Sequence, residues 1–250
     1  YNNLLRLQLK PVQDFEKTFA RKLDSSQYIY NPKIGFLSLS QPLQPDEVLA
    51  VAFQYTYNGK VYQVGEFSQD LPPDTTFGDQ KVLFLKLLKA TSQRPRLPIW
   101  QLMMKNVYSV GYGSLERQDF KLDVLYEEPG LGSKRYFPYG NINQGTPILT
   151  LVNLDRLNNQ NDPQPDGVFD FVDYYTVIPQ YSRVIFPVLE PFGRDLAKQV
   201  YTSPPITAKD TLYYPLYDSI KAVAQQFPNL NRFLLKGTAK TSSTSDISIG

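Results

Sequence analysis

The sequence contains neither cysteine nor histidine among its 250 residues. Without cysteine the chain has no disulfide, no thiolate nucleophile and no Cys-ligated zinc or iron–sulfur site. Without histidine it lacks the usual general base, the Ser-His-Asp triad and the commonest transition-metal ligand. The chemistry that remains is that of carboxylates, lysine, tyrosine and hard metals. The redox compartment stays open, because a chain without cysteine fits both the cytosol and an exported protein.

An excess of one charge and long apolar runs are also absent. Lysine and arginine number 26 against 24 aspartates and glutamates, a formal charge of +2 that is spread along the chain. This balance gives no electrostatic footprint for nucleic acid or an anionic membrane. No stretch approaches the ~20 apolar residues of a membrane helix. The length allows a substantial core, and 20 prolines with 14% aromatic residues favour strands and loops over a helical bundle.

The clearest local structure is a β-hairpin over residues 47–68. Asn58-Gly59 separates two strand-like runs and supplies the two positive-φ residues of a type I′ turn. One face of the resulting pair is bulky and aromatic and the other is mostly small and polar, so we expect a sheet that is packed on one side. The pairs expected on the aromatic face are Tyr57–Lys60, Tyr55–Tyr62, Phe53–Val64 and Val51–Glu66.

Further elements follow from changes in the hydrophobic period. Alternation predicts strands, and a proline start followed by an apolar stripe predicts short helices. Apolar residues on both faces of 81–89 predict a more deeply buried strand. The other strands are expected over 120–126, 168–178, 183–189 and from 233 onward. The short helices are expected near 98–108, 147–157 with Thr146 as N-cap, 196–200, and 220–223 with Asp218 as cap.

These elements predict a fold class that is mainly β with a few short α-helices, a β-rich α+β arrangement. Residues 1–202 form one composite β-rich region with the helices near 98–108 and 147–157. Residues 203–250 form a connector, a short helix and the start of the next β segment. The first residue is Tyr1, and the alternation of 246–249 is typical of a strand just beginning, so we expect a fragment of a longer polypeptide.

The segment 158–173 concentrates oxygen donors on a predicted loop. Calcium takes six to eight such oxygens and needs neither histidine nor cysteine, so Asp162, Asp166 and Asp170 are candidate calcium ligands. Their spacing does not match an EF-hand loop. The competing interpretation is turn chemistry, because Asn-Asp-Pro and Pro-Asp-Gly form turns on their own account. No other cofactor is indicated.

The residue types allow two other chemistries. Paired carboxylates could hydrolyse glycosides, with Asp119, Asp123, Glu127 and Glu128 as nominal candidates beside Asp166 and Asp170, but alternating acids on a strand are usually its solvated face. Tyrosine rings could stack on sugars, although tyrosine more often fills a core or an interface. The stacking candidates are Tyr28, Tyr30, Tyr55, Tyr57, Tyr62, Tyr213 and Tyr214. The sequence therefore gives no catalytic residue.

Several strings, in order along residues 48–193, resemble the SprA (Sov) family. They are Val48-Leu49-Ala50-Val51-Ala52-Phe53-Gln54-Tyr55-Thr56-Tyr57-Asn58-Gly59, Gln63-Val64-Gly65-Glu66-Phe67, Leu102-Met103-Met104-Lys105-Asn106-Val107-Tyr108-Ser109, Leu154-Asp155-Arg156-Leu157-Asn158, Pro165-Asp166-Gly167-Val168-Phe169-Asp170 and Ile185-Phe186-Pro187-Val188-Leu189-Glu190-Pro191-Phe192-Gly193. The resemblance implies a piece of the outer-membrane translocon of the type IX secretion system, a very large β-barrel that serves gliding motility and exports cell-surface adhesins. The family carries no catalytic motif.

The resemblance leaves open which part of the translocon this chain forms. A barrel wall shows repeated segments of about ten alternating residues, and only residues 47–68 come close. We therefore expect an extramembrane or barrel-associated portion, on the periplasmic or the cell-surface side. The implied partners are the rest of the translocon chain, other outer-membrane secretion components and exported cargo proteins, with no nucleic acid. The alternative function is a surface β-sandwich module that binds carbohydrate or calcium.

Overall fold

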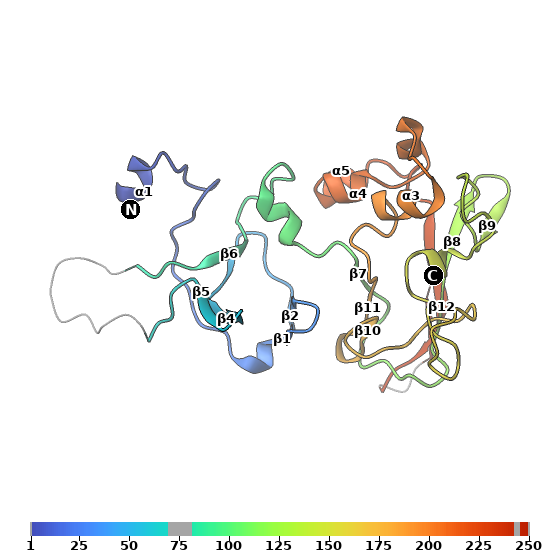
Figure 1. The fold of residues 1–250 in the computed structure, drawn as a ribbon, viewed down its shortest axis with the longest axis horizontal. Coiled ribbons are helices and arrows are strands. Elements are labelled where there is room, and N and C mark those ends of the chain that lie inside the picture. Colours follow the sequence, from blue (N-terminus) through green and yellow to red (C-terminus); the bar gives the residue numbers. More distant parts are fainter. Residues whose placement is uncertain (1, 70–81, 243–245, 250) are drawn as a thin grey trace. The chain divides into compact units, whose positions relative to one another are not determined.

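A computed structural model describes residues 2–69, 82–242 and 246–249 of the chain (Figure 1). The chain forms two compact units: unit 1 comprises Tyr1–Tyr28 and Gln41–Met103, and unit 2 comprises Ile29–Ser40 and Met104–Gly250. Small antiparallel sheets and short helices build both units, so the predicted fold class is confirmed at that level. No helix of the described residues is long and apolar enough to cross a membrane.

Unit 1 consists of short elements and two separate two-stranded sheets. β3 pairs with β6, and β4 pairs with β5, both antiparallel. The elements are α1 (Asn2–Arg6), the 3-10 helix η1 (Ser25–Gln27), β3 (Leu49–Val51), β4 (Phe53–Tyr57), β5 (Lys60–Val64), β6 (Lys86–Lys89) and the 3-10 helix η2 (Pro98–Leu102).

The β4–β5 hairpin has the predicted turn and the predicted register. Asn58 and Gly59 have φ of 49° and 74°, as a type I′ turn requires. Tyr55 lies opposite Tyr62, and the ladder ends at the pair of Phe53 with Val64. The predicted continuation to Val51–Glu66 is wrong, because β3 pairs with β6 instead. The expected packing of one face is also wrong, since every residue of β4 is exposed.

Two other predictions in unit 1 need correction. The helix expected over 98–108 is only the 3-10 helix η2, because Met103 takes extended backbone angles and ends it. Its buried residue is Trp100, whereas Leu102 is 48% exposed. The strand expected over 81–89 is limited to Lys86–Lys89 and is half-buried. Lys81 lies outside the described residues.

Unit 2 contains the larger sheets and most of the core. One sheet has the order β13-β12-β8-β9 and another the order β10-β11-β7. The elements are β1 (Tyr28–Asn31), β2 (Phe36–Leu39), β7 (Val107–Ser109), β8 (Lys121–Glu128), β9 (Gly132–Lys134), α2 (Ile148–Leu151), β10 (Val177–Ile178), η3 (Pro179–Tyr181), β11 (Arg183–Ile185), α3 (Arg194–Val200), η4 (Ile206–Asp210), α4 (Pro215–Asp218), α5 (Lys221–Ala224), β12 (Phe233–Lys240) and β13 (Asp246–Ile249).

β8 forms the predicted alternating strand at the centre of unit 2. Leu122, Val124 and Tyr126 are buried, as period-two patterning requires of one face. β12 pairs with β8 over six residues, with Gly237 opposite Leu122. A Cβ atom at Gly237 would lie 1.9 Å from the Lys121 carbonyl oxygen, so only glycine allows the two strands to approach this closely. Because β12 comes from residues 203–250, that segment completes a sheet begun within 1–202.

Several predicted elements of unit 2 are shorter in the structure. The helix expected over 147–157 is α2 alone, capped at Pro147 rather than at Thr146. It ends because Asn153 takes a φ of 61°, a left-handed conformation that asparagine tolerates. The strand expected over 168–178 is only β10, since Tyr174 has a φ of 60° and turns the chain. The strand expected over 183–189 is β11 alone.

The other end of unit 2 follows the sequence pattern more closely. A helix is present where residues 196–200 predicted one, and it begins earlier, at Arg194. β12 begins at Phe233 as predicted. Asp218 does not cap α5, because it is the last residue of α4 and Ile220 occupies the N-cap.

The β1–β2 hairpin packs on unit 2, although it precedes most of unit 1 in the sequence. Phe36 is buried against Ile178 and Ile185. An Arg183 Nη1 donates to the Ser38 hydroxyl at 2.7 Å, which ties β11 to β2. Residues 29–40 therefore contribute to a small apolar cluster of unit 2 that is separate from its main core.

Candidate functional site

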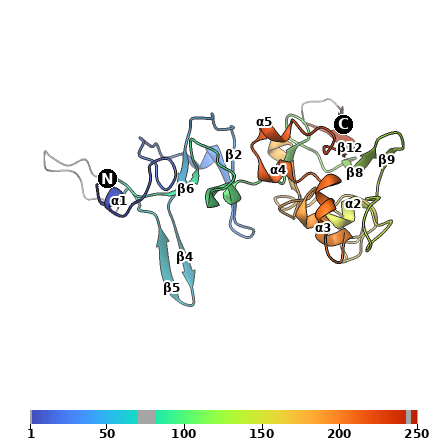
Figure 2. The ribbon, with the colours of Figure 1, turned by 90° about the horizontal axis from the view of Figure 1, so that it is seen from above.

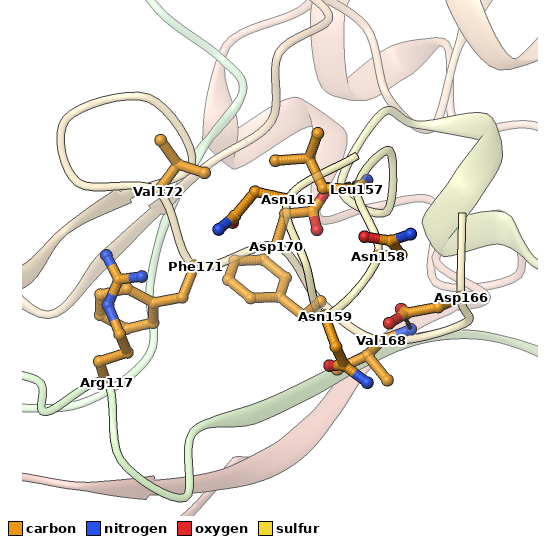
Figure 3. Close-up of a pocket in the computed structure, with 11 residues that line it drawn as sticks. Arg117, Leu157, Asn158, Asn159, Asn161, Asp166, Val168, Asp170, Phe171 and Val172 are labelled. Carbon is orange, nitrogen blue, oxygen red and sulfur yellow. Dashed lines mark hydrogen bonds between the residues drawn. The ribbon is translucent and has the colours of Figure 1, made fainter. Parts of the chain in front are cut away.

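A polar hollow of about 180 Å³ lies over the loop 157–172 of unit 2 (Figure 3). Asp166 and Asp170, two of the three candidate calcium ligands, line it, and Asp162 does not. The volume is below the ~300 Å³ at the lower end of small-molecule sites. The remaining lining residues are Arg117, Leu157, Asn158, Asn159, Asn161, Val168, Phe169, Phe171 and Val172.

A buried carboxylate holds the loop in place through its hydrogen bonds. Asp155 is fully buried. Its Oδ2 accepts hydrogen bonds from the Thr150 hydroxyl at 2.7 Å and the Gly167 amide at 3.1 Å, and its Oδ1 accepts one from the Asp166 amide at 3.0 Å. Asp155 thereby fixes the Pro-Asp-Gly turn to α2. The sequence reasoning missed this residue, since an acid after an apolar helix carries no sign of burial.

Asp170 closes the other side of the loop. Its Oδ2 accepts hydrogen bonds from the backbone amides of Arg156 at 2.5 Å and Leu157 at 3.0 Å. Burial raises the pKa of Asp170, the two amide donors oppose that rise, and the charges of Asp155 and Asp166 add to it. The side chain therefore links two stretches of the loop through main-chain groups.

The other two candidate ligands also take part in turns. Asp166 Oδ1 accepts a hydrogen bond from the Val168 amide at 3.0 Å, and the Asp162 amide donates to Asn158 Oδ1 at 2.9 Å. Within the ranges that the structure describes, no three acidic side chains form a group that could hold a metal ion. These hydrogen bonds are the ones expected if the aspartates stabilise turns. The calcium hypothesis gains nothing from them and stays a prediction.

Three of the nominal glycosidase acids form ion pairs with basic side chains. Asp119 forms an ion pair with Lys240, Asp123 with Arg135, and Glu128 with Lys134. Hydrogen bonding from Lys134 lowers the pKa of Glu128. These three acids thus serve local ion pairs within unit 2.

The tyrosine candidates for sugar stacking are spread over both units. Tyr55 and Tyr62 stack on each other at a centroid distance of 5.2 Å in the β4–β5 hairpin. Tyr213 is buried and donates its hydroxyl to the Ala224 carbonyl at 2.8 Å. The Tyr214 ring lies beneath the Arg194 guanidinium at 4.8 Å. These tyrosines fill cores and local contacts, as tyrosine usually does.

No protein-family model and no curated protein matches this sequence. The chemistry of the hollow must therefore be read from its own residues. Three asparagine carboxamides, two carboxylates and the Arg117 guanidinium surround it. Arg117 lies over the Phe171 ring (Figure 3), at 5.2 Å from its centroid. Its Nη2 also lies 3.7 Å from Asp173 Oδ1. This arrangement can hydrogen-bond small polar groups and hold the loop in one conformation.

Proposed function

We propose that the chain is a non-enzymatic structural portion of an outer-membrane protein-secretion translocon, of the type IX system that exports cell-surface adhesins and supports gliding motility. It is the extramembrane or barrel-associated part of a much longer polypeptide. The proposal starts from the ordered strings between residues 48 and 193 that resemble the SprA (Sov) family. Its partners are the rest of the translocon chain, other outer-membrane secretion components and exported cargo.

The observation that carries the proposal is that the resembling strings of unit 2 are bonded to one another. Asp155, in one string, accepts amide hydrogen bonds from Asp166 and Gly167, in the next. Asn106 Nδ2 donates to the Phe186 carbonyl at 2.7 Å, and the Phe186 amide donates to the Asn106 carbonyl at 2.9 Å, which joins two further strings. The residues that carry the resemblance therefore include ones whose hydrogen bonds join separate segments of unit 2.

A framework role agrees with what the polar side chains of these strings do. Asp155, Asp166 and Asp170 accept hydrogen bonds from main-chain amides. Such contacts give a loop a single conformation. A structural portion of a large assembly needs loops with a single conformation, and it does not need catalytic side chains.

The gene that encodes the full polypeptide tests the proposal first. We expect a very long reading frame with repeated strand segments of about ten alternating residues around this portion. A reading frame of ordinary length that joins this portion to a catalytic domain would contradict the proposal.

A secretion assay tests the function itself. In the source organism, deletion of the gene should abolish adhesin at the cell surface and stop gliding, and the intact gene supplied in trans should restore both. Surface labelling of intact cells measures the adhesin, and the total outer-membrane protein profile serves as the control. Normal surface adhesin in the deletion strain would rule the function out.

A further inference from the structure

In the part of the chain that the structure describes, no strand pairs with the outer edge of β4. β4 and β5 form a two-stranded sheet, and within the described residues neither takes part in another sheet. The hairpin projects from the other elements of unit 1 (Figure 2). An isolated two-stranded hairpin is only marginally stable in water. The edge therefore gains no support from a neighbouring strand among the described residues.

The register of the hairpin determines which backbone groups this edge presents. In a hairpin with a two-residue loop, the residues that flank the loop, Tyr57 and Lys60, exchange both hydrogen bonds, and bonded pairs then alternate with non-bonded pairs. Gln54 and Thr56 belong to the non-bonded pairs. Their N–H and C=O groups point away from β5 and repeat about every 6.8 Å, two residues of a strand. Another extended backbone carries donors and acceptors at this spacing.

β4 also lacks the features that normally keep an edge strand from pairing. Native edges are protected by lysine, proline, bulges or very short strands. β4 has the sequence Phe-Gln-Tyr-Thr-Tyr, without a charge or a proline. Phe53, Tyr55 and Tyr57 lie on one face and are 43%, 47% and 63% exposed. An edge of this composition left open is an aggregation site, so a partner is expected on it.

We propose that the free edge of β4 binds an extended segment of another polypeptide, which adds to the hairpin as a third, antiparallel strand. The segment carries apolar side chains on the face shared with Tyr55 and no net positive charge, since Lys60 is the one charged residue between positions 53 and 64. A second copy of this chain fits less well. β4 is about 17 Å long, and two such edges bury far less than the ~1,200 Å² of a stable dimer.

The test uses the full 250-residue chain and a fluorescent peptide of alternating valine and threonine with one terminal glutamate. Thr56→Pro removes an outward N–H and places a ring on the edge, and it leaves the bonds to β5 in place. The matched control, Thr56→Val, keeps the N–H. We expect the peptide to bind the wild type and Thr56→Val equally, and Thr56→Pro to raise the Kd at least tenfold. Fluorescence anisotropy measures the Kd.

Further measurements keep the proposal falsifiable. Nuclear Overhauser contacts between the Tyr55 and Tyr62 rings report whether the hairpin survives in Thr56→Pro. If the hairpin of Thr56→Pro does not survive, the test uses the wild type and the same peptide with alternate amides N-methylated. We expect this methylated peptide not to bind the wild type. The proposal fails if the peptide does not bind the wild type, if the methylated peptide binds equally well, or if an intact Thr56→Pro hairpin binds unchanged. It also fails if sedimentation shows a dimer that Thr56→Pro abolishes. None of these outcomes depends on the proposed secretion function.

Discussion

At the scale of single residues, Asp155 is expected to stabilise the loop 157–172 more than Asp162, Asp166 or Asp170 does. Asp155→Ala removes the acceptor for three donors beneath the loop. We expect it to lower the free energy of unfolding by about 2 kcal/mol, because donors left unsatisfied inside a protein cost more than a hydrogen bond contributes. Urea unfolding measures the change. Asp162→Ala, on the exposed rim, should stay within about 0.5 kcal/mol. Equal losses in both variants would contradict this role.

Gly59 tests the turn of the hairpin. Gly59→Val places a β-branched side chain at a φ of 74°, which costs on the order of 1–2 kcal/mol. Because the hairpin is exposed, the loss should appear as faster hydrogen exchange of its cross-strand amides, roughly tenfold, with unit 2 unaffected. Thr56→Val, at an extended position, is the control. Unchanged exchange in Gly59→Val would show that the turn does not need a left-handed residue.

Calcium dependence is the remaining residue-level question. The acids at 162, 166 and 170 accept or support turn hydrogen bonds, so we expect a chelator to leave the melting temperature unchanged. Asp166→Asn should have a small effect, because asparagine keeps the turn contact while losing a charged ligand. Differential scanning calorimetry with chelator and with added calcium measures both. A calcium-dependent melt that Asp166→Asn abolishes would establish the metal site instead.

Single residues also show what a sequence reveals. The Asn58-Gly59 turn could be predicted because its conformation depends on two adjacent residues, and its register follows from the loop length. The role of Asp155 could not be predicted from the sequence. Its carboxylate is buried against the amides of Asp166 and Gly167, which reach it only after the loop has folded back. The candidate acids were located correctly on a loop, and the residue that organises the loop was not among them.

At the scale of elements, the contact between β8 and β12 depends on one missing side chain. Gly237→Ala would place a Cβ atom 1.9 Å from the Lys121 carbonyl oxygen, so the strands must separate. We expect a loss of about 3 kcal/mol in urea unfolding, at the upper end for overpacking. Lys236→Ala, at an exposed position of the same strand, is the control and should stay within about 0.5 kcal/mol. A Gly237→Ala variant as stable as its control would contradict the close approach.

Elements were predicted well in type and poorly in extent. The alternation of β8 survives in the structure because its buried face packs in one core. The proline start at 98 was correct, whereas Pro147 is the N-cap of a helix that begins at Ile148, and both elements end within two turns. Met103 becomes extended and Asn153 becomes left-handed, and both changes follow from where the chain must go next. The spacing of apolar residues in the sequence does not show where the chain leaves a helix.

At the scale of the whole molecule, the β1–β2 hairpin is expected to stabilise unit 2. Phe36→Ala removes a buried ring from the contact with Ile178 and Ile185, at a cost of about 3 kcal/mol. Hydrogen exchange should accelerate at the amides of β11 and not in the β4–β5 hairpin. Ile34→Ala, which is 44% exposed, is the control. Faster exchange confined to unit 1 would show that the hairpin does not belong to the core of unit 2.

This hairpin also imposes a delay during synthesis. Ser40 and its hydrogen-bond partner Tyr181 are 141 residues apart, so at about 5–20 residues per second β2 waits roughly 7–30 s for its partner. During that interval Phe36 lacks its apolar partners, and a protein that shields nascent apolar segments would find a binding site there. Because β8 and β12 are closer in the sequence than Ser40 and Tyr181, the earliest strands of unit 2 wait longer for their partners than β8 does.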